Sequence, residues 1–318
     1  MSSSPTPADP RVTVVIATNR GGPFLAEAVD SVRAQTLPSW ELVLVDDGAP
    51  ADVAARLDHL VAGDARMRVQ HQVNRGLSVS RNVGAALGRG EYLSYLDDDD
   101  VWHPDRLRLQ VAALDAAPDA LLCYSAAWTM DADGTRVDVP WLPTGLPREP
   151  YLQGEVDLPR IVTMTMRRAA VLAYGGFNPS FRYCEDDEFI LRMMLHGELT
   201  SVPDELVGYR RHAGNASGTN PVLRQLTGER IRLLQLWAAE ATGDRALIRA
   251  ARVNLDRFRR RLADYSASEA LAWARRGRLG RSATELARGL RFSPRGTART
   301  IGAKVTTVLR RGGTTTAR

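Results

Sequence analysis

Three short, mostly apolar runs in the first third of the chain constrain its fold more than any other feature. They lie at residues 11–17, 40–45 and 91–96, and none is interrupted by glycine or proline. Runs of this kind are typical of strands in a buried parallel sheet. Residues 24–35 and 80–87, which lie between them, carry apolar residues at helical spacing. Strands that alternate with helices predict a parallel sheet with right-handed crossovers.

Each of these runs ends in polar residues. The first is followed by Thr18-Asn19-Arg20, the second by Asp46-Asp47, and the third by four consecutive aspartates, Asp97–Asp100. In parallel sheets ligands bind beyond the carboxyl ends of the strands, so we expect these three segments to converge on one edge. Four adjacent carboxylates repel one another, which favours a bound cation.

The next part of the sequence predicts further strands, a loop and a helix. Residues 119–130 and 163–166 have the composition of strands, whereas the proline-rich residues 131–160 are typical of a long irregular loop. A helix is expected over residues 189–196, and the acidic residues 185–188 before it suit the start of a helix.

From residue 221 onward the pattern is helical. The expected helices cover residues 222–241, 245–265, 268–276, 281–290 and 297–311. We therefore expect two parts, an α/β domain over residues 11–220 and a helical region over residues 221–311, with disordered ends at residues 1–10 and 312–318.

Charge is divided unevenly between these parts. Residues 222–318 carry 22 Lys and Arg against 7 Asp and Glu, a net +15, whereas residues 1–221 carry 20 against 30, a net −10. Cys123 and Cys184 are too few for a disulfide framework, so we expect free thiols. The chain has neither a basic start followed by an apolar stretch nor an apolar segment of the roughly 18 residues that a membrane span needs. A cytoplasmic protein is therefore expected.

A series of independent motifs runs through residues 11–215. They are Val14–Arg20, Leu25–Ser31 with Gln35-Thr36, Trp40–Gly48, Asn74–Asn82, Ala86–Trp102 with Pro104–Leu107, Gly175–Phe177 with Phe181-Arg182, and Glu185-Asp186 with Leu191-Arg192. In this order and at these spacings they resemble the inverting nucleotide-sugar glycosyltransferases of family 2. The resemblance implies the GT-A fold, an α/β architecture with a mostly parallel mixed sheet flanked by helices, followed here by a C-terminal helical extension.

The four aspartates match the family's Asp-X-Asp pattern. The resemblance implies that Asp99 binds Mg²⁺ or Mn²⁺ directly, that Asp97 and Asp98 lie near the ribose, the sugar or the metal, and that Asp100 shapes the turn. Such a cation would neutralise the charge that develops on a nucleoside diphosphate leaving group. His212 lies in a segment that resembles the family's Arg-X-His motif, and it is either a further metal or phosphate ligand or a structural residue.

The same resemblance assigns residues to the nucleotide-sugar donor. Asp47, or as second choice Asp46, would accept a hydrogen bond from the base, and Thr18 and Arg20 would line the pocket. Arg81 would offer its forked guanidinium to phosphate.

Inversion in a single displacement requires a general base that takes the proton of the acceptor hydroxyl. Asp186 matches the family's base, and its place at a helix start favours the ionised carboxylate. Family members commonly carry an aromatic residue before the position of Asn19, which follows Thr18 directly here, so UDP, dTDP and GDP donors stay open. The acceptor would be a glycan, lipid-linked or small-molecule hydroxyl in polysaccharide or glycolipid synthesis.

Several alternatives stand beside this interpretation. The arginine-rich tail would contact an anionic membrane surface from the cytoplasmic side, or it would pack on the catalytic domain or form a homodimer. A sugar-phosphate nucleotidyltransferase also uses carboxylate-bound Mg²⁺, but Gly21-Gly22-Pro23 is too short for its glycine-rich phosphate loop. A nucleic-acid-binding protein would use the tail, but few aromatic residues accompany the arginines and the body is acidic, so no nucleic acid is expected.

Overall fold

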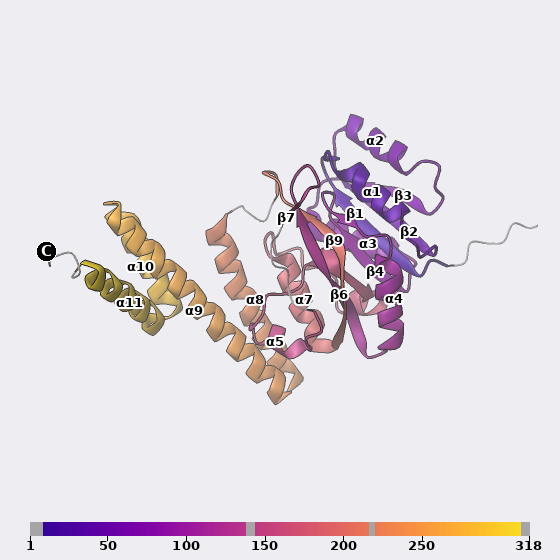
Figure 1. Ribbon diagram of the computed structural model, residues 1–318. Helices are drawn as coiled ribbons and strands as arrows, with labels where there is room; N and C mark the ends of the chain where they lie inside the picture. The colour runs from indigo at the N-terminus through magenta and orange to yellow at the C-terminus, as the bar shows by residue number, and fades with distance from the viewer. Residues whose placement is uncertain (1–8, 138–143, 216–219, 313–318) are drawn as a thin grey trace, which may run out of the picture. The chain divides into compact units, whose positions relative to one another are not determined.

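The computed structural model describes residues 9–137, 144–215 and 220–312. It divides into two compact units, Met1–Arg224 and Gln225–Arg318, which are both drawn in Figure 1. The division falls within helix α8 (Pro221–Thr242), shortly after the boundary at residue 220 that the sequence predicts.

The first unit contains four parallel strands. β1 (Val12–Thr18) lies between β2 (Trp40–Asp47) and β4 (Tyr92–Leu96), and β3 (Met67–Gln72) extends the sheet beyond β2. The three pairings among them are parallel. Every residue of β2 and β4 is buried, which explains why the corresponding sequence runs are mostly apolar.

The other half of the sheet mixes strand directions. β8 (Met164–Arg167) pairs antiparallel with β4 and with β6 (Ala120–Met130), while β6 is parallel to β9 (Glu198–Arg210). β5 (Val101–Trp102) completes the order β3-β2-β1-β4-β8-β6-β9-β5, and β7 (Arg136–Val137) pairs with β6. Because β5 follows the four aspartates directly and pairs with the end of β9, strand β9 brings the chain back to them.

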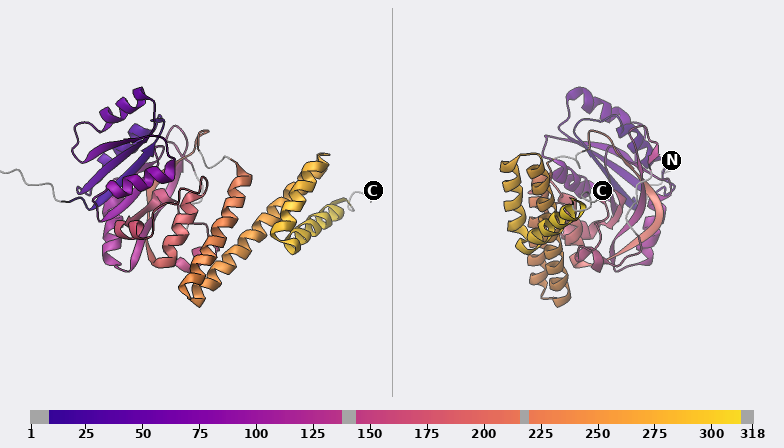
Figure 2. Two further views of the ribbon diagram at one scale, coloured as in Figure 1. Left: turned by 180° about the vertical axis from the view of Figure 1, so that it is seen from behind. Right: turned by 60° about the vertical axis from the view of Figure 1, so that its left-hand side comes forward.

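Helices join these strands and pack on the sheet. They are α1 (Leu25–Arg33), α2 (Ala51–Val61), α3 (Leu77–Leu87), α4 (Arg106–Ala116), α5 (Arg148–Leu152), α6 (Arg168–Ala173) and α7 (Glu185–His196), with a 3₁₀ turn at Ile161–Thr163. Helix α3 packs on β1 and β2, and α4 packs on β6 and β9. Figure 2 shows the helices and the sheet from two further sides. These findings confirm the α/β class and the mixed sheet that the sequence predicts.

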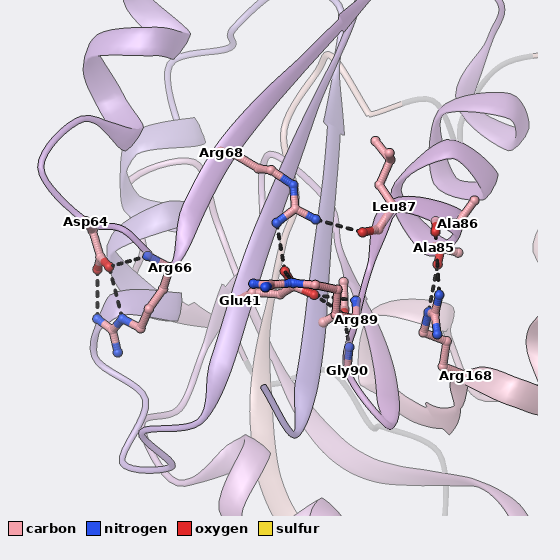
Figure 3. Close-up of polar contacts among 11 residues, drawn as sticks. Glu41, Asp64, Arg66, Arg68, Ala85, Ala86, Leu87, Arg89, Gly90 and Arg168 are labelled. Atoms are coloured by element: carbon pink, nitrogen blue, oxygen red, sulfur yellow. Dashed lines mark hydrogen bonds and ion pairs between the residues drawn. The ribbon is translucent and has the colours of Figure 1, made fainter. Parts of the chain in front are cut away.

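Helix α3 lies very close to β1. A Cβ atom at Gly84 would come within 2.4 Å of the Val15 side chain, so glycine is needed where the helix crosses the strand. The last turn of the helix is held by Arg168, whose Nε donates to the Ala85 carbonyl at 3.0 Å (Figure 3). Such donors satisfy carbonyl groups that a helix leaves unpaired at its C-terminus.

A buried carboxylate, Glu41, joins this helix end to the sheet. Glu41 is 1% exposed and accepts hydrogen bonds from Thr13 Oγ1 (2.8 Å), Arg68 Nη1 (2.7 Å) and the Arg89 backbone N–H (2.5 Å). Arg68 also donates to the Leu87 carbonyl at 2.8 Å, so one network links β1, β2, β3 and α3 (Figure 3). Burial alone would raise the pKa of Glu41, but these hydrogen bonds outweigh burial and lower it below the usual value.

In the part of the second unit that the structure describes, α8 is followed by three more helices. They are α9 (Arg245–Arg275), α10 (Leu279–Phe292) and α11 (Pro294–Gly312). These three pack against one another, and Figure 1 shows them side by side. Asn254 Nδ2 donates to Gln235 Oε1 at 2.9 Å and so ties α9 to α8. Across the described ranges, no helix has both the length and the apolar character needed to cross a bilayer.

One prediction about secondary structure was wrong, and one strand was missed. The helices expected at 245–265 and 268–276 form the single helix α9, because Ser266 and Ala267 are fully buried within the helical packing instead of forming a turn. Strand β9 was not predicted, since Pro203 and the polar residues around it interrupt the apolar pattern.

The predicted irregular loop at 131–160 is partly regular. It contains β7 and α5, and the helix α5 forms because Tyr151 and Leu152 are buried. Residues 138–143 of this loop lie outside the described residues. The same is true of nearly all of residues 1–10 and 312–318, for which disorder was predicted.

Replacing Glu41 with Gln should destabilise the protein most at neutral pH. The substitution keeps the shape of the side chain but removes the charge that accepts from Arg68 and Arg89, so we expect a loss of about 1–3 kcal/mol in unfolding free energy. The lowered folded-state pKa means that this contribution is complete above the ordinary value of 4.5 and is lost as the pH falls through the folded-state value. Urea unfolding at neutral and acidic pH should therefore show a difference that shrinks in acid.

The matched control is Glu91→Gln. Glu91 is an exposed carboxylate paired with Arg11 at 3.0 Å, and its loss should cost less than about 1 kcal/mol. Equal effects of the two substitutions would contradict the role given to the buried carboxylate.

Candidate active site

The carboxyl ends of β1, β2 and β4 lie at one edge of the sheet, as the sequence predicts. Thr18 stands opposite Asp46 in the parallel register of β1 and β2. Thr18 Oγ1 donates to Asp98 Oδ2 at 2.5 Å. This hydrogen bond joins the end of β1 to the acidic block, by which we mean Asp97–Asp100.

The acidic block brings three carboxylates close together. Asp97, Asp99 and Asp100 each offer an oxygen, and these oxygens lie within 4.8 Å of one another. Burial and the charge of Asp97 raise the pKa of Asp99, and the same two causes raise the pKa of the more deeply buried Asp100 further. Asp100 Oδ2 is buried and accepts no hydrogen bond from the described residues. Mg²⁺ and Mn²⁺ prefer carboxylate oxygens, so this group of side chains fits such a cation.

Arg210, the last residue of β9, lies against the acidic block. Its backbone N–H donates to Asp100 Oδ1 (2.8 Å), and its guanidinium donates to the carbonyls of Asp99 (2.9 Å) and Ala132 (2.9 Å) and to Glu27 Oε2 (2.6 Å). Arg210 is 1% exposed. A positive charge at this depth offsets the neighbouring carboxylates more strongly than it would in water.

His212 and Asn215 orient Asp99. Both donate to Asp99 Oδ2, His212 from Nε2 at 3.0 Å and Asn215 from Nδ2 at 3.1 Å. The backbone N–H of Gly214 donates to His212 Nδ1 at 3.1 Å, which assigns the proton of the neutral ring to Nε2. His212 therefore acts here as a partner of Asp99, and its role as a direct ligand stays a prediction.

Arg81 links the acidic block to helix α7. From α3, its Nη2 donates to Asp97 Oδ1 at 2.8 Å and its Nη1 to Glu185 Oε1 at 3.2 Å, while its guanidinium lies 5.0 Å from the centre of the Phe177 ring. Burial alone would lower the pKa of Arg81, but Asp97, Glu185 and Asp186 together raise it. Both terminal nitrogens of the guanidinium that was predicted to bind phosphate thus already donate to carboxylates of the same chain.

The first turn of α7 presents two carboxylates beside Arg81. The helix begins at Glu185, directly after Cys184, whose φ of 56° is in the left-handed region. Burial raises the pKa of Glu185, although Arg81 opposes the shift. Asp186 is only half-buried and accepts the backbone N–H of Asp187 at 3.0 Å. Glu185 and Asp187 are half-buried as well, so the choice of Asp186 as the base rests on its match to the family motif and stays a prediction.

The two carboxylates at the end of β2 are already hydrogen-bonded. Asp47 accepts from Gln72 Nε2 and from the two backbone N–H groups of residues 75–76, each at 2.8 Å, and these bonds outweigh burial and lower its pKa. Asp46 Oδ2 lies 2.8 Å from the His71 ring nitrogen. Ser80 contributes a further hydrogen bond that lowers the pKa of Asp47, so about four partners already surround this carboxylate, and its contact with a base stays a prediction.

The structure brings most of the predicted site residues into one connected group. Direct contacts join Thr18 to Asp98, Asp97 to Arg81, and Asp99 to His212. Arg20 is exposed beyond the end of β1.

The sequence analysis missed the residues that hold this group in place. Arg210 pairs with Glu27 across 183 positions in the chain, a separation at which no local pattern indicates contact. The one available signal for Arg210 was its position two residues before His212. Asn215 and Glu185 belong to motifs that the sequence analysis identified. Their contacts with Asp99 and Arg81, however, could be seen only in the folded structure.

Comparison with known proteins gives a family match. The family model described as Glycosyl transferase family 2 matches residues 13–175, about half of the chain. Uncharacterized protein y4gI of Sinorhizobium fredii is 29% identical over 240 residues, which cover 74% of this chain and 26% of y4gI. Putative glycosyltransferase EpsH of Bacillus subtilis is 27% identical over 207 residues, which cover 64% of this chain and 56% of EpsH. The chain thus spans about a quarter of one relative and about half of the other.

Solved structures show a similar fold. S. aureus TarS 1-349 in complex with UDP-GlcNAc matches with a TM-score of 0.63 at 16% identity, over 87% of this chain and 90% of that one. The same protein in complex with UDP matches with a TM-score of 0.60 at 17% identity over the same shares. At sequence identities this low, the comparison shows a shared fold and nothing further.

Replacing Arg81 with Met should destabilise the first unit by about 3–5 kcal/mol, because Asp97 and Glu185 lose their buried counter-charge. Adding Glu185→Gln should recover part of the loss, since it removes one of the two uncompensated carboxylates. Urea unfolding of the wild type, both single variants and the double variant gives the coupling energy.

The control for this cycle is Arg108→Met. Arg108 is exposed and pairs with Asp105 at 3.0 Å, so its loss should cost less than about 1 kcal/mol. Strict additivity of Arg81→Met and Glu185→Gln would show that the two side chains do not form the pair described.

Proposed function

Because the chain belongs to glycosyl transferase family 2, we propose that it transfers a sugar from a nucleotide-diphosphate donor to a hydroxyl acceptor. One observation carries this proposal. The carboxylates of Asp97, Asp99 and Asp100 and the half-buried carboxylate of Asp186 belong to one group, which Arg81 connects through Asp97 and Glu185. A site for displacement at a sugar needs both parts, one that neutralises a diphosphate leaving group and one that receives a proton.

The donor in this proposal is a UDP, dTDP or GDP sugar. Two of the similar structures are complexes of TarS with UDP-GlcNAc and with UDP, which supports a nucleotide-sugar donor for this chain as well. Thr18 ends β1 and donates to Asp98 of the acidic block, and Arg20 follows two residues later. Asp47 is the proposed partner of an N–H of the base, for which it would exchange one of its present donors. The chain carries no aromatic residue between Thr18 and Asn19 to stack on a base, so the identity of the base stays open among these donors.

We assign the cofactor site to the acidic block. A Mg²⁺ or Mn²⁺ ion bound by Asp99 and Asp97, with Asp100 as a further ligand, would supply Lewis-acid neutralisation of the diphosphate. Within the chain, His212 fixes the orientation of Asp99, and Arg81 fixes that of Asp97. Arg210 holds the backbone of the block, so the carboxylates keep their positions before a ligand arrives.

Asp186 is the proposed general base of an inverting displacement. The acceptor hydroxyl loses its proton to the Asp186 carboxylate as its oxygen forms a bond to the anomeric carbon. At the same time the bond from that carbon to the diphosphate oxygen breaks, and the nucleoside diphosphate leaves with the electron pair. Glu185 and Arg81 position the base, because Glu185 is one residue away and pairs directly with the Arg81 guanidinium.

The proposed acceptor is a hydroxyl of a glycan or of a lipid-linked or small-molecule substrate. A role in the synthesis of a cell-surface polysaccharide or glycolipid is part of this proposal and rests on the family alone. The acceptor would approach the half-buried carboxylate of Asp186 from solvent.

Substitution of Asp99 by Asn should weaken the binding of Mn²⁺. Mn²⁺ should stabilise the wild type in a thermal-shift assay. The variant should lose most of this stabilisation, because removing one carboxylate charge lowers the attraction of the block for a cation. A screen of UDP, dTDP and GDP sugars with and without Mn²⁺ then identifies the donor. Asp204→Asn, at an exposed position of β9, is the control and should keep the shift. Failure of every nucleotide sugar to bind the wild type would refute the proposed donor class.

Substitution of Asp186 by Asn should abolish sugar transfer but leave donor binding intact. General bases contribute on the order of 100-fold to 10,000-fold in rate, and an amide cannot accept the proton. Asp187→Asn changes the neighbouring carboxylate in the same way and should retain activity. Transfer rates with the identified donor, compared with its thermal shift, separate the two effects. Normal turnover by the Asp186 variant would show that Asp186 is not the general base.

A further inference from the structure

The turn between α9 and α10 concentrates positive charge without acidic partners. Four arginines, Arg275, Arg276, Arg278 and Arg281, fall within seven positions, and all four are exposed. The sequence contains no acidic residue between Glu269 and Glu285. We call residues 273–281 the basic turn.

Several other arginines of the same unit form ion pairs with glutamates. Arg252 pairs with Glu240, Arg259 with Glu229 and Arg288 with Glu285, at 3.2, 2.7 and 2.8 Å. In the described part of the chain, none of the four arginines of the basic turn forms such a pair. Their charge is therefore available to an anion outside the chain.

The basic turn also carries apolar side chains among its arginines. The Trp273 ring lies 5.2 Å from the guanidinium carbon of Arg276 and 4.8 Å from that of Arg281. Leu279, the first residue of α10, is 71% exposed. Cation–π contacts hold the two guanidinium groups beside the indole, so charge and apolar surface form one patch.

We propose that the basic turn binds the surface of an anionic lipid bilayer. Anionic headgroups supply the negative charge that the four arginines lack, and each basic residue near such a surface strengthens binding. Tryptophan favours the interface between headgroups and acyl chains, and the exposed Leu279 would gain by burial there. A nucleic acid would satisfy the arginines but would leave the leucine without an apolar partner, so the bilayer fits the whole patch better.

The net charge of the unit supports the same partner. Residues 225–318 carry 21 Lys and Arg against 7 Asp and Glu, a net +14, which attracts the chain toward an anionic surface over distances longer than direct contact. This contact is independent of the proposed sugar transfer, because vesicle binding can be measured without donor or acceptor.

The test is co-flotation of the full chain with vesicles of phosphatidylcholine, with or without phosphatidylglycerol. Binding is expected only with phosphatidylglycerol, and it should weaken as salt rises from about 0.1 M to about 1 M, where the Debye length falls to about 3 Å. The double variant Arg275→Glu/Arg278→Glu should bind on the order of 30-fold more weakly, since two contributions of the kind expected for basic residues at a surface are removed.

Two further variants separate the turn from general charge. Arg245→Glu/Arg249→Glu makes the same charge change at exposed positions near the other end of α9, and it should weaken binding much less. Leu279→Ser keeps the charge but removes the apolar side chain, and it should weaken binding on the order of tenfold. Circular dichroism of each variant verifies that the helices are intact.

Three outcomes would overturn the proposal. The first is no binding of the wild type to anionic vesicles, and the second is an equal loss in the two double variants. The third is tighter binding to a single-stranded oligonucleotide than to vesicles with no effect of Leu279→Ser on either, which would identify a nucleic acid as the partner.

Discussion

The acidic block depends on two buried arginines that come from distant parts of the chain. Four consecutive carboxylates at the end of a strand repel one another, and burial of Asp98, Asp99 and Asp100 increases the cost of that charge. Arg210 binds the backbone and one carboxylate of the block, and Arg81 binds another. The rest of the site follows from this neutralisation, because the same two arginines connect the end of β9, the middle of α3 and the start of α7 to the block.

Helix α3 is the element through which the site is coupled to the body of the sheet. Its close approach to β1 at Gly84 sets its position across the strands, and Arg68 and Arg168 bind the carbonyls of its last turn. Arg81 lies about one turn before Gly84 in the same helix and is buried, so its guanidinium has little freedom to follow a ligand. This rigidity suits a residue that aligns Asp97 with the start of α7.

The features that the sequence could predict are those that depend on neighbouring residues. The apolar runs at residues 11–17, 40–45 and 91–96 identified the strands, and the rules for parallel sheets placed their ends together. The contacts of Arg210 could not be predicted, since its strand begins in a polar segment and its partners are far away in the chain. The fork of Arg81 was expected to face phosphate, because nothing local showed that Glu185 would occupy it.

The long separations in this site also determine when it can form during synthesis. Arg81 and Asp97 are 16 positions apart, so their pair can form early, but Glu185 lies 104 positions from Arg81 and Arg210 lies 110 from Asp100. Until β9 leaves the ribosome, the nascent chain carries its aspartates without their second arginine. Long-range contacts also close slowly. A chain cut short before residue 210 would therefore carry an acidic block in which Arg81 is the only one of these two arginines present, and this edge would be exposed to the chaperones and proteases around it.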